Sequence, residues 1–275
     1  MAGDPRDVLT RPAPPPDVTV AYGDHPDQCA DLRRPAGEGP TRPLVVVVHG
    51  GFWRAEYDRA HTGPMAAALA ALGHPVAQLE YRRTGPPGDG RPHPLTDVLT
   101  GVAALPGLAA AALPGRVAAV PPVLVGHSAG GHLALYAAAH APDSVAGVLA
   151  LAPVADLAEA YRLDLDGGAV AALLGGGPAD VPDRYADADP SALVPIRVRT
   201  VVVHGTLDQQ VPVATSRSWV AADRASGGDA TLVELPECEH FGLIAPDSAA
   251  WPRVVEALRS LHDDLQGIDA ASPTR

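Results

Sequence analysis

The chain has 275 residues, a formal net charge of −12, 47% hydrophobic residues and 19% charged residues, which is enough apolar material for one large or two small domains. All 20 basic residues are arginines and asparagine is absent, which excludes a Schiff-base lysine, a P-loop and a Cys-His-Asn triad. Two cysteines exclude a disulfide framework, and the acidic balance disfavours nucleic acid as a partner.

We expect a cytoplasmic protein with no membrane contact. The stretch MAGDPRDVLTRPAPPPDV lacks the apolar core of a secretory signal, and the longest apolar runs contain Gly or Pro and reach only strand or short-helix length. We also expect residues 1–17 and 266–275 to be flexible tails on either side of one domain that spans residues 18–265.

Strands and helices are predicted to alternate along the chain. Residues 18–32 predict two short antiparallel strands, and the run LVVVV at 44–48 is typical of a strand buried on both faces of a parallel sheet. The remaining predicted strands are 75–81, 122–125, 146–151, 199–203 and 230–235, and the predicted helices are 59–72, 95–113, 129–141, 216–225 and 248–265. A Gly/Pro-rich loop is predicted at 84–94. This order predicts an α/β fold with a mostly parallel central sheet and helices on both faces.

Residues 153–195 interrupt the alternation, because they place two short Ala/Leu-rich helices and many turns between two strands. They would form a small cap insertion at the carboxyl edge of the sheet, where the ligand sites of α/β proteins lie. The segment carries eight acidic and two basic residues, which is half of the net charge. Its charge indicates either a solvated surface or a cap that disfavours strongly anionic substrates.

The sequence GHSAGG at residues 126–131 stands between a predicted strand and a predicted helix. In that context G-x-S-x-G predicts a nucleophile elbow, a tight turn that lifts the Ser128 hydroxyl above the sheet. The glycines let backbone segments pass close, and the helix start, including the N–H of Ala129, can hold an oxyanion. A structural turn with an inert serine is the alternative, and His132 in place of lysine excludes a phosphate loop.

A second motif, HGGFW at residues 49–53, directly follows the run at 44–48. Adjacent glycines let the backbone turn its amides inward, and an oxyanion hole needs N–H groups from two loops. We therefore assign the donors to Gly51 or Phe52 together with Ala129. Phe52 and Phe241 are the two phenylalanines of the chain, and either both line the acyl pocket or both belong to the ordinary core.

Two later motifs supply an acid and a base. HGTLD at residues 204–208 follows the fifth long strand, and ECEHF at residues 237–241 follows the sixth. A serine hydroxyl needs a base, neutral imidazole titrates in a suitable range, and a carboxylate fixes the tautomer of the imidazole. Because Ser128, Asp208 and His240 each fall just past the carboxyl end of a strand, three distant positions can converge.

Other residues compete for these roles. Asp156 in the cap and Asp247 beyond His240 are alternatives for the acid. Eleven histidines are present, and His240 is chosen as the base because it stands in the late loop after the last strand. The elbow is expected to turn His127 and His132 elsewhere. His49 is expected to brace the oxyanion loop, and His204, which precedes the acid, is expected to pack in the interior.

Together these motifs resemble the α/β-hydrolase superfamily over roughly residues 18–265. Within it, HGGFW, GHSAGGH and HGTLDQQVP resemble kynurenine formamidases (arylformamidases) and small carboxylesterases of the hormone-sensitive-lipase neighbourhood. The resemblance implies an α/β-hydrolase fold, with Ser128 as nucleophile, Asp208 as acid, His240 as base, and Gly51 and Phe52 as oxyanion donors. Esterases of the neighbouring branch usually carry a third glycine where Phe52 stands, and an aromatic residue there favours the formamidase side.

Residues beside these motifs are candidates for substrate contacts. Trp53, Arg54 and Phe241 are predicted to bind substrate, and Arg82 and Arg83 lie near the mouth by sequence order. An arginine can pair with a carboxylate such as that of N-formylkynurenine, and a solvated or structural arginine is the alternative. The sequence has no metal motif, so we expect neither a metal nor another cofactor.

The sequence therefore predicts a metal-free serine hydrolase that cleaves a small acyl ester or an aryl formamide through an acyl-enzyme intermediate. A thioesterase or acyltransferase of a biosynthetic pathway would use the same residues, and a non-catalytic binding protein with the same fold is a third hypothesis. The expected partner is a small-molecule ester or amide, and a homodimer is left open.

Overall fold

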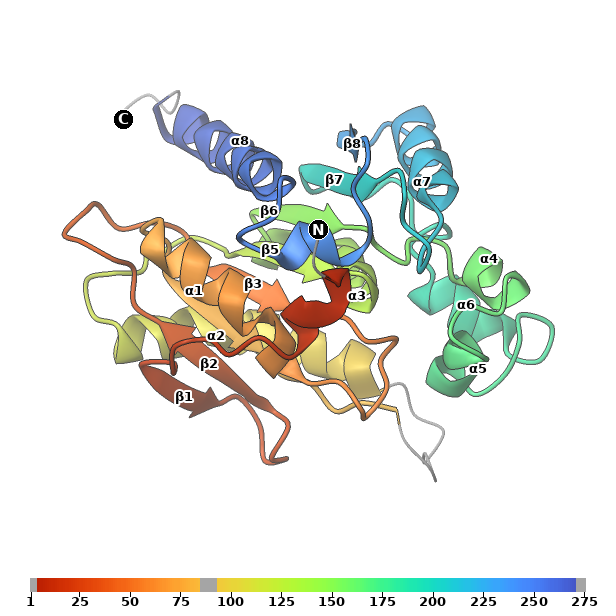
Figure 1. Ribbon diagram of the computed structural model, residues 1–275, viewed down its shortest axis with the longest axis horizontal. Helices are drawn as coiled ribbons and strands as arrows, with labels where there is room; N and C mark the ends of the chain where they lie inside the picture. The colour runs from red at the N-terminus through yellow and green to blue at the C-terminus, as the bar shows by residue number, and fades with distance from the viewer. Residues whose placement is uncertain (1–3, 85–92, 271–275) are drawn as a thin grey trace.

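A mostly parallel sheet forms the centre of the protein (Figure 1). The computed structural model describes residues 4–84 and 93–270. Its strands are β1 (Val18–Ala21), β2 (Cys29–Arg33), β3 (Val45–Val48), β4 (Val76–Leu79), β5 (Val123–His127), β6 (Gly147–Leu151), β7 (Thr200–Gly205) and β8 (Ala230–Leu235). They pair in the order β1-β2-β4-β3-β5-β6-β7-β8, antiparallel from β1 to β4 and parallel from β4 to β8. The predicted α/β fold and its antiparallel opening are confirmed.

Helices cover both faces of the sheet (Figure 1). The α-helices are α1 (Gly63–Ala71), α2 (His93–Ala112), α3 (Ala129–His140), α4 (Leu157–Arg162), α5 (Ala169–Leu174), α6 (Pro182–Ala188), α7 (Val213–Ala225) and α8 (Trp251–Ala270). Short 3-10 helices are η1 (Pro5–Leu9), η2 (Arg59–Thr62), η3 (Pro142–Ser144) and η4 (Phe241–Ile244). The buried residues of α1 and α8 share one core with η1 and η4, and those of α2, α3 and α7 share the other.

The valine run of β3 shows why helices cover both faces of the sheet. Successive side chains of a strand point to opposite faces. Val45 and Val47 lie in the core beneath α1 and α8, whereas Val46 and Val48 lie in the core beneath α2 and α3. All four are at most 1% exposed, and each such burial stabilises the fold by about 1.5–3 kcal/mol. A strand without polar positions therefore requires helices on both of its faces.

By length and composition, α2 is the one helix in the described part of the chain that could cross a membrane. In the fold it packs against the sheet and α3, and 39% of its apolar window is buried. Leu95, Val98, Val102 and Leu105 face the core, and Pro106 is accommodated within the helix. The apolar composition of α2 is thus used in packing against the sheet.

The N-terminal segment (residues 4–17) differs from the expected flexible tail. Its η1 helix is capped by Asp4 and packs against η2 and η4. Val8 is only 1% exposed and belongs to the core beneath α1 and α8. The Pro-rich composition concealed this contact, because one buried valine is enough to hold a short helix onto a larger core. Residues 1–3 lie outside the described part of the chain.

Two further boundaries differ from the sequence expectation. The last helix, α8, runs to Ala270, beyond the expected end of the domain at residue 265, and residues 271–275 lie outside the described part. Most of the Gly/Pro-rich loop predicted at 84–94 also lies there, because residues 85–92 are not described.

The cap (residues 153–195) contains three short helices, α4, α5 and α6, where two were expected. They gather at one end of the molecule, beyond the sheet (Figure 1). Two histidines of α3 hold this group, because His132 Nε2 lies 3.0 Å from the carbonyl oxygen of Ala188 and His140 Nε2 lies 2.9 Å from that of Asp187. The cap is therefore attached to the same helix that begins at Ser128.

Candidate active site

Ser128 occupies a strained turn between β5 and α3, as the elbow motif predicts. Its φ is 56°, in the left-handed region that a residue with a side chain rarely adopts. A Cβ on Gly126 would lie 2.2 Å from the carbonyl oxygen of Gly130, and one on Gly130 would lie 2.1 Å from that of Val48. Both glycines are thus required sterically, and the turn brings Ser128 against the end of β3.

His240 and Asp208 form a close pair on the loops that follow β8 and β7. His240 Nδ1 lies 2.6 Å from Asp208 Oδ2, and the Asp208 carboxylate is completely buried. The backbone N–H groups of Gln210 and Val211 donate to Oδ1 at 2.8 and 2.9 Å, and His204 Nε2 lies 3.2 Å from Oδ2. Every partner of Asp208 stabilises its ionised form.

These partners determine the charge of Asp208. Burial acts to raise the pKa of its carboxyl, but the hydrogen bonds from His204 and His240 outweigh burial and hold the pKa well below its usual range. An ionised carboxylate accepts a hydrogen bond from His240 Nδ1, which fixes the tautomer of the ring and leaves Nε2 free to accept a proton. His240 Nε2 has no hydrogen-bond partner among the described residues.

The packing of His127 was missed by sequence reasoning, which expected the elbow to turn it elsewhere. Its ring lies 4.5 Å from that of His240, centroid to centroid, and its Nε2 lies 3.1 Å from the carbonyl oxygen of His240. Burial, followed by the proximity of His240, lowers the pKa of His127 well below its usual value, so the ring is neutral. His127 therefore fixes the backbone of His240 without adding a charge.

The oxyanion loop (residues 49–57) faces the turn that carries Ser128. Arg54 N donates to the carbonyl oxygen of Gly51 at 2.9 Å, and the two residues between them, Phe52 and Trp53, have φ of 48° and 60°. Two consecutive positive φ values define a type I′ turn, which two aromatic residues adopt only under strain. A Cβ on Gly50 would lie 3.0 Å from Ser128 Cβ, so the loop and the turn are in direct contact.

Three backbone amides are left unpaired beside Ser128. The N–H groups of Gly51, Phe52 and Ala129 donate no hydrogen bond to any residue that the structure describes. Ala129 is the first residue of α3, where an N–H has no partner within the helix, and Gly51 and Phe52 line the cleft. An N–H group without a protein partner can donate to a negatively charged oxygen of a bound molecule.

Ser128, His240 and the oxyanion loop line one cleft with an empty volume of about 450 Å³. Aromatic and aliphatic side chains form much of its wall, and Asp166 of the cap is the lining carboxylate. The lining residues are Leu9, Gly51, Phe52, Tyr57, His61, His127, Ser128, Asp166, Gln210, His240 and Phe241. His61 is buried, which lowers its pKa to about 4 and keeps its ring neutral.

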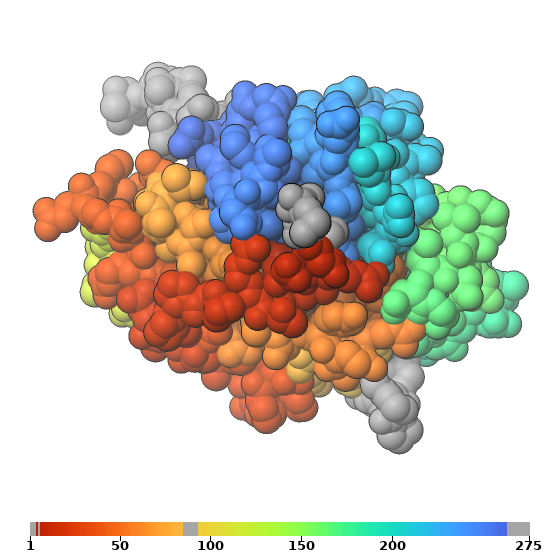
Figure 2. Space-filling model, in the orientation of Figure 1, coloured from red at the N-terminus to blue at the C-terminus, as the bar shows by residue number. Residues whose placement is uncertain are grey.

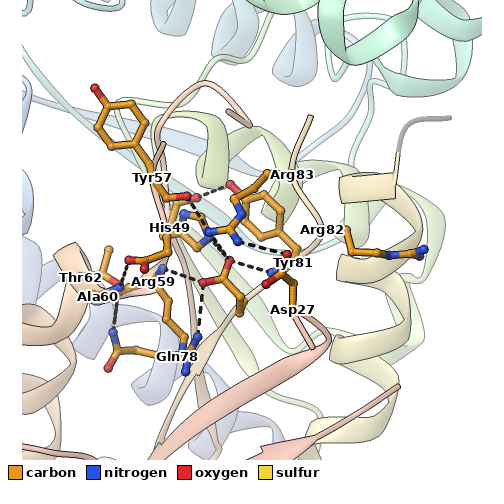
Figure 3. A network of polar contacts seen from close by, with 12 residues as sticks. Asp27, His49, Tyr57, Arg59, Ala60, Thr62, Gln78, Tyr81, Arg82 and Arg83 are labelled. Atoms are coloured by element: carbon orange, nitrogen blue, oxygen red, sulfur yellow. Dashed lines mark hydrogen bonds and ion pairs between the residues drawn. The ribbon is translucent and has the colours of Figure 1, made fainter. Parts of the chain in front are cut away.

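A second buried carboxylate, Glu80 at the end of β4, holds the oxyanion loop from behind. Its Oε1 lies 2.8 Å from His49 Nε2, and the backbone N–H of Arg59 donates to its Oε2 at 3.0 Å. His49 Nδ1 lies 2.8 Å from the carbonyl oxygen of Gly50, so both nitrogens of the ring face acceptors. Figure 3 shows His49, Arg59 and Arg83 converging from three segments.

The same carboxylate also fixes the far end of the loop. Arg83 Nη1 lies 3.5 Å from Glu80 Oε1 and donates to the carbonyl oxygen of Tyr57 at 2.9 Å (Figure 3). Burial acts to raise the pKa of Glu80, but the hydrogen bond with His49 and the neighbouring Arg59 and Arg83 lower it to about 2. Glu80 is therefore an ionised anchor beneath the oxyanion loop, a role that sequence reasoning did not foresee.

The expected substrate contact of Trp53 is wrong, and Arg54 is not among the residues that line the cleft. Trp53 is 0% exposed, lies in the main core, and packs edge-on against His132 with ring centroids 5.1 Å apart. Arg54 donates to the Asp166 carboxylate and to the carbonyl oxygens of Asp166 and Gly167. Arg54 thus connects the oxyanion loop to the cap. Phe241 does line the cleft.

Arg82 and Arg83 also lie outside the cleft lining. Arg82 pairs with the fully buried Asp97 of α2 through two donors and through its backbone N–H. Its side chain extends toward α2 and away from the network around His49 (Figure 3). Arg83 contacts Asp27, Glu80 and Tyr57. Neither arginine is placed to bind a substrate carboxylate.

The structure also decides among the other candidates. Asp156 caps α4 by accepting from Glu159 N, and Asp247 forms a surface ion pair with Arg11, so neither carboxylate reaches His240. Burial raises the pKa of the Cys238 thiol to about 11, which makes it a packed thiol rather than a nucleophile. Within residues 4–84 and 93–270, no group of three or more His, Cys, Asp or Glu side chains could hold a metal ion.

The sheet order, the strained serine after β5 and the His–Asp pair after β7 and β8 together define an α/β-hydrolase fold. A family model supports this assignment independently. The model of the BD-FAE family, an α/β-hydrolase family, matches residues 30–222, and the chain belongs to that family. The matched region includes Ser128 and Asp208 and ends before His240.

Known proteins with related sequences or structures bear esterase names. NocK from Nocardia uniformis subsp. tsuyamanensis, a protein named as an esterase, is 35% identical over 159 residues, which cover 54% of this chain and 40% of that protein. Esterase B from Lactobacillus rhamnosis superposes with a TM-score of 0.78 at 20% identity, over 98% of this chain and 93% of that one. A carbohydrate esterase from gut microbiota superposes with a TM-score of 0.76 at 17% identity, over 91% and 99%. At these identities the two solved structures establish the fold only.

Proposed function

We propose that the protein is a serine esterase that hydrolyses small, uncharged carboxylic esters. One arrangement carries the proposal: Ser128 shares a cleft with His240, whose Nδ1 is bound by the buried Asp208, and with Gly51 and Phe52, whose amides are unpaired among the described residues. The membership of the BD-FAE family and the esterase names of the related proteins support it.

The first half of the reaction forms an acyl-enzyme. Ser128 Oγ attacks the ester carbonyl carbon while His240 Nε2 accepts the hydroxyl proton. The carbonyl oxygen becomes an oxyanion that accepts hydrogen bonds from the amides of Gly51, Phe52 and Ala129, and each donor is worth about 3 kcal/mol of barrier. As the tetrahedral intermediate collapses, His240 gives the proton to the departing alkoxide oxygen, and the alcohol leaves.

The second half regenerates the serine. Water gives a proton to His240 Nε2 as its oxygen attacks the acyl carbon, and the same three amides hold the second oxyanion. As this intermediate collapses, the bond between the acyl carbon and Ser128 Oγ breaks, His240 returns the proton to Oγ, and the carboxylic acid leaves. Asp208 stays ionised throughout and stabilises the imidazolium that forms twice in each cycle. The low pKa of Asp208 fits this role, because a carboxylate that took up the proton would stop orienting the ring.

The lining of the cleft favours an uncharged substrate. Leu9, Phe52 and Phe241 offer apolar contacts, and Asp166 places a negative charge at the cap side. No arginine is among the described residues that line the cleft, and the arginines predicted to bind a substrate carboxylate pair with protein carboxylates instead. These contacts favour a neutral ester over an anionic aryl formamide such as N-formylkynurenine.

The first experiment measures kcat/KM for p-nitrophenyl acetate, p-nitrophenyl butyrate and N-formylkynurenine. We expect hydrolysis of the esters to exceed that of the formamide, and Ser128→Ala to lower ester turnover by about 10⁴-fold or more. Ser226→Ala, the same substitution at an exposed serine after α7, is the matched control and should retain full activity. Full ester turnover by Ser128→Ala would refute the proposal, and a faster formamide reaction would refute the substrate class.

Two further measurements separate the other hypotheses. An alkyl fluorophosphonate should label the peptide that contains Ser128, whereas a non-catalytic binding protein with an inert serine would stay unlabelled. Product analysis with added alcohols or thiols separates hydrolysis from acyl transfer. We expect free acid as the main product, and acyl transfer to the added acceptor as the main product would identify a transferase.

A further inference from the structure

The N-terminal segment lies across the rim of the candidate active site. Figure 2 shows it as a red band between the blue C-terminal part and the orange part of the chain. Its η1 helix packs against η2, which follows the oxyanion loop, and against η4, which begins one residue after His240. A short segment far from Ser128 in sequence thus contacts both sides of the cleft.

Contacts to separate parts of the fold hold the segment in place. Arg11 Nη1 lies 2.6 Å from Asp247 Oδ1, just beyond η4. Arg33, a buried residue of β2, donates from Nη1 to the carbonyl oxygen of Pro14 at 2.8 Å. Val8, which precedes both anchors in the chain, is buried in the core beneath α1 and α8. The position of η1 is therefore set by the body of the protein.

Leu9, the last residue of η1, lines the cleft and also packs against the edge of the core beneath α1 and α8. It lines the cleft together with Phe241 and His240, and its side chain is partly buried. The guanidinium of Arg6 lies 6.0 Å from the centroid of the Phe241 ring, within reach of a cation–π contact that connects the start of η1 to the same wall. Leu9 and Phe241 thus form an apolar wall beside His240.

We propose that Leu9 is a specificity-determining residue, and that the wall it forms with Phe241 limits the length of the apolar group that an ester can place beside His240. The inference rests on the proposed esterase function and deepens it. Discrimination by an apolar wall is graded, because one methylene group more or less changes kcat/KM by about 10–200-fold. Replacing leucine by alanine removes three carbon atoms from the wall and opens space for a longer chain.

The test compares chain-length profiles of the wild type, Leu9→Ala and Leu9→Trp. One series varies the acyl chain of p-nitrophenyl esters from acetate to octanoate, and a second varies the alcohol of acetate esters over the same range. We expect Leu9→Ala to raise the ratio of kcat/KM for the longest over a short ester by about tenfold in one series, and Leu9→Trp to lower it by about as much. The responding series identifies the group that contacts Leu9.

Val8→Ala is the matched control, because Val8 lies in the same helix but faces the core. It removes two carbon atoms from the core and none from the cleft lining, so the ratio should stay within about twofold of wild type. An equal shift in Val8→Ala, or unchanged profiles in both Leu9 variants, would overturn the inference while Ser128-dependent ester hydrolysis persists. Loss of that hydrolysis in the wild type would instead overturn the proposed function, and this inference with it.

Discussion

Two buried carboxylate–histidine pairs flank the cleft, and they look alike at first. Asp208 lies 2.6 Å from His240 on the loops after β7 and β8, and Glu80 lies 2.8 Å from His49 at the ends of β4 and β3. The Asp208 side chain is 0% exposed and that of Glu80 is 2% exposed, and each has a pKa lowered by its partners against the effect of burial. Neither the distance nor the pKa direction separates the two pairs.

The second nitrogen of each ring separates them. His240 Nε2 has no partner among the described residues and its ring lines the cleft, whereas His49 Nδ1 faces the carbonyl oxygen of Gly50 at 2.8 Å. One ring can therefore move a proton, and the other only holds the peptide that precedes the Gly51 amide. A strongly perturbed carboxylate is thus insufficient to identify a catalytic residue, and the free nitrogen of its partner must be found as well.

The largest effect is expected when the pair of Asp208 and His240 is disrupted. Asp208→Asn retains the shape of the side chain but removes the charge that fixes the His240 tautomer, so we expect kcat for p-nitrophenyl butyrate to fall by about 10⁴-fold. The loss should be in kcat, because the cleft lining keeps its residues. Circular dichroism of the variant checks that it folds. A decrease below tenfold in a folded variant would remove Asp208 from the triad.

The second pair should matter less and in a different way. Glu80→Gln weakens the contacts to His49, Arg59 and Arg83, so the oxyanion loop relaxes and its amides shift. We expect kcat to fall by about 10–100-fold with little change in KM, which is less than the about 10²–10³-fold that complete loss of one oxyanion donor produces. Steady-state kinetics over a range of ester concentrations separates the two constants.

The control for Glu80→Gln is Asp97→Asn. It disrupts another ion pair, which the fully buried Asp97 of α2 forms with Arg82. Asp97 accepts hydrogen bonds from Gln28 and Arg82, which both lie outside the oxyanion loop, so its substitution should lower stability and leave kcat near the wild-type value. An equal decrease of kcat in both variants would mean that Glu80 acts through general stability alone.

The low pKa of Glu80 predicts how the stability of the fold changes with pH, and Glu80→Gln tests that prediction. The pKa of Glu80 is about 2 in the folded protein against an ordinary 4.5, so its carboxylate stabilises the fold fully above pH 4.5. That contribution, about 3 kcal/mol, is lost as the pH falls toward 2, because the unfolded chain takes up the proton first. The difference in unfolding free energy between wild type and Glu80→Gln should therefore shrink across this range.

Urea unfolding at pH 6, 4 and 3 measures this difference. Glu56→Gln, the same substitution at an exposed position, controls for the loss of one charge. A constant difference between wild type and Glu80→Gln over the three pH values would contradict an ionised anchor at Glu80.

The fold and the two glycine motifs could be predicted because each has a local signal. Runs of valine and leucine mark buried strands, and Gly126 and Gly130 are sterically required at the turn around Ser128. The assignment of Asp208 and His240 depended on chain order, which the sheet topology converts into proximity. The strands and the glycine turns can be recognised in the sequence because neighbouring residues encode them.

Contacts between distant segments could not be predicted in the same way. Arg54 meets Asp166 across 112 positions, and nothing local to either residue indicates the other. Phe52 and Trp53 are adjacent aromatics in one strained turn, and only its conformation decides that the first lines the cleft and the second enters the core. Leu9 stands in a Pro-rich stretch whose composition resembles that of a tail.

A third carboxylate, Asp166, sharpens the comparison because it lines the cleft without being buried. Its side chain is 40% exposed and pairs with Arg54. Solvent and salt therefore partly screen the effect of its charge on a substrate. Asp166→Asn should raise kcat/KM for an anionic ester, p-nitrophenyl hydrogen succinate, relative to neutral p-nitrophenyl butyrate by about fivefold at low ionic strength. The gain should shrink as salt is added.

The control for Asp166→Asn is Asp187→Asn, which removes the same charge from an exposed part of the cap, in α6. If Asp166 acts locally, only its own substitution should change the preference between the two esters. An equal change in both variants would assign the effect to the net charge of the cap, and Asp166 would then have no local part in selecting the substrate.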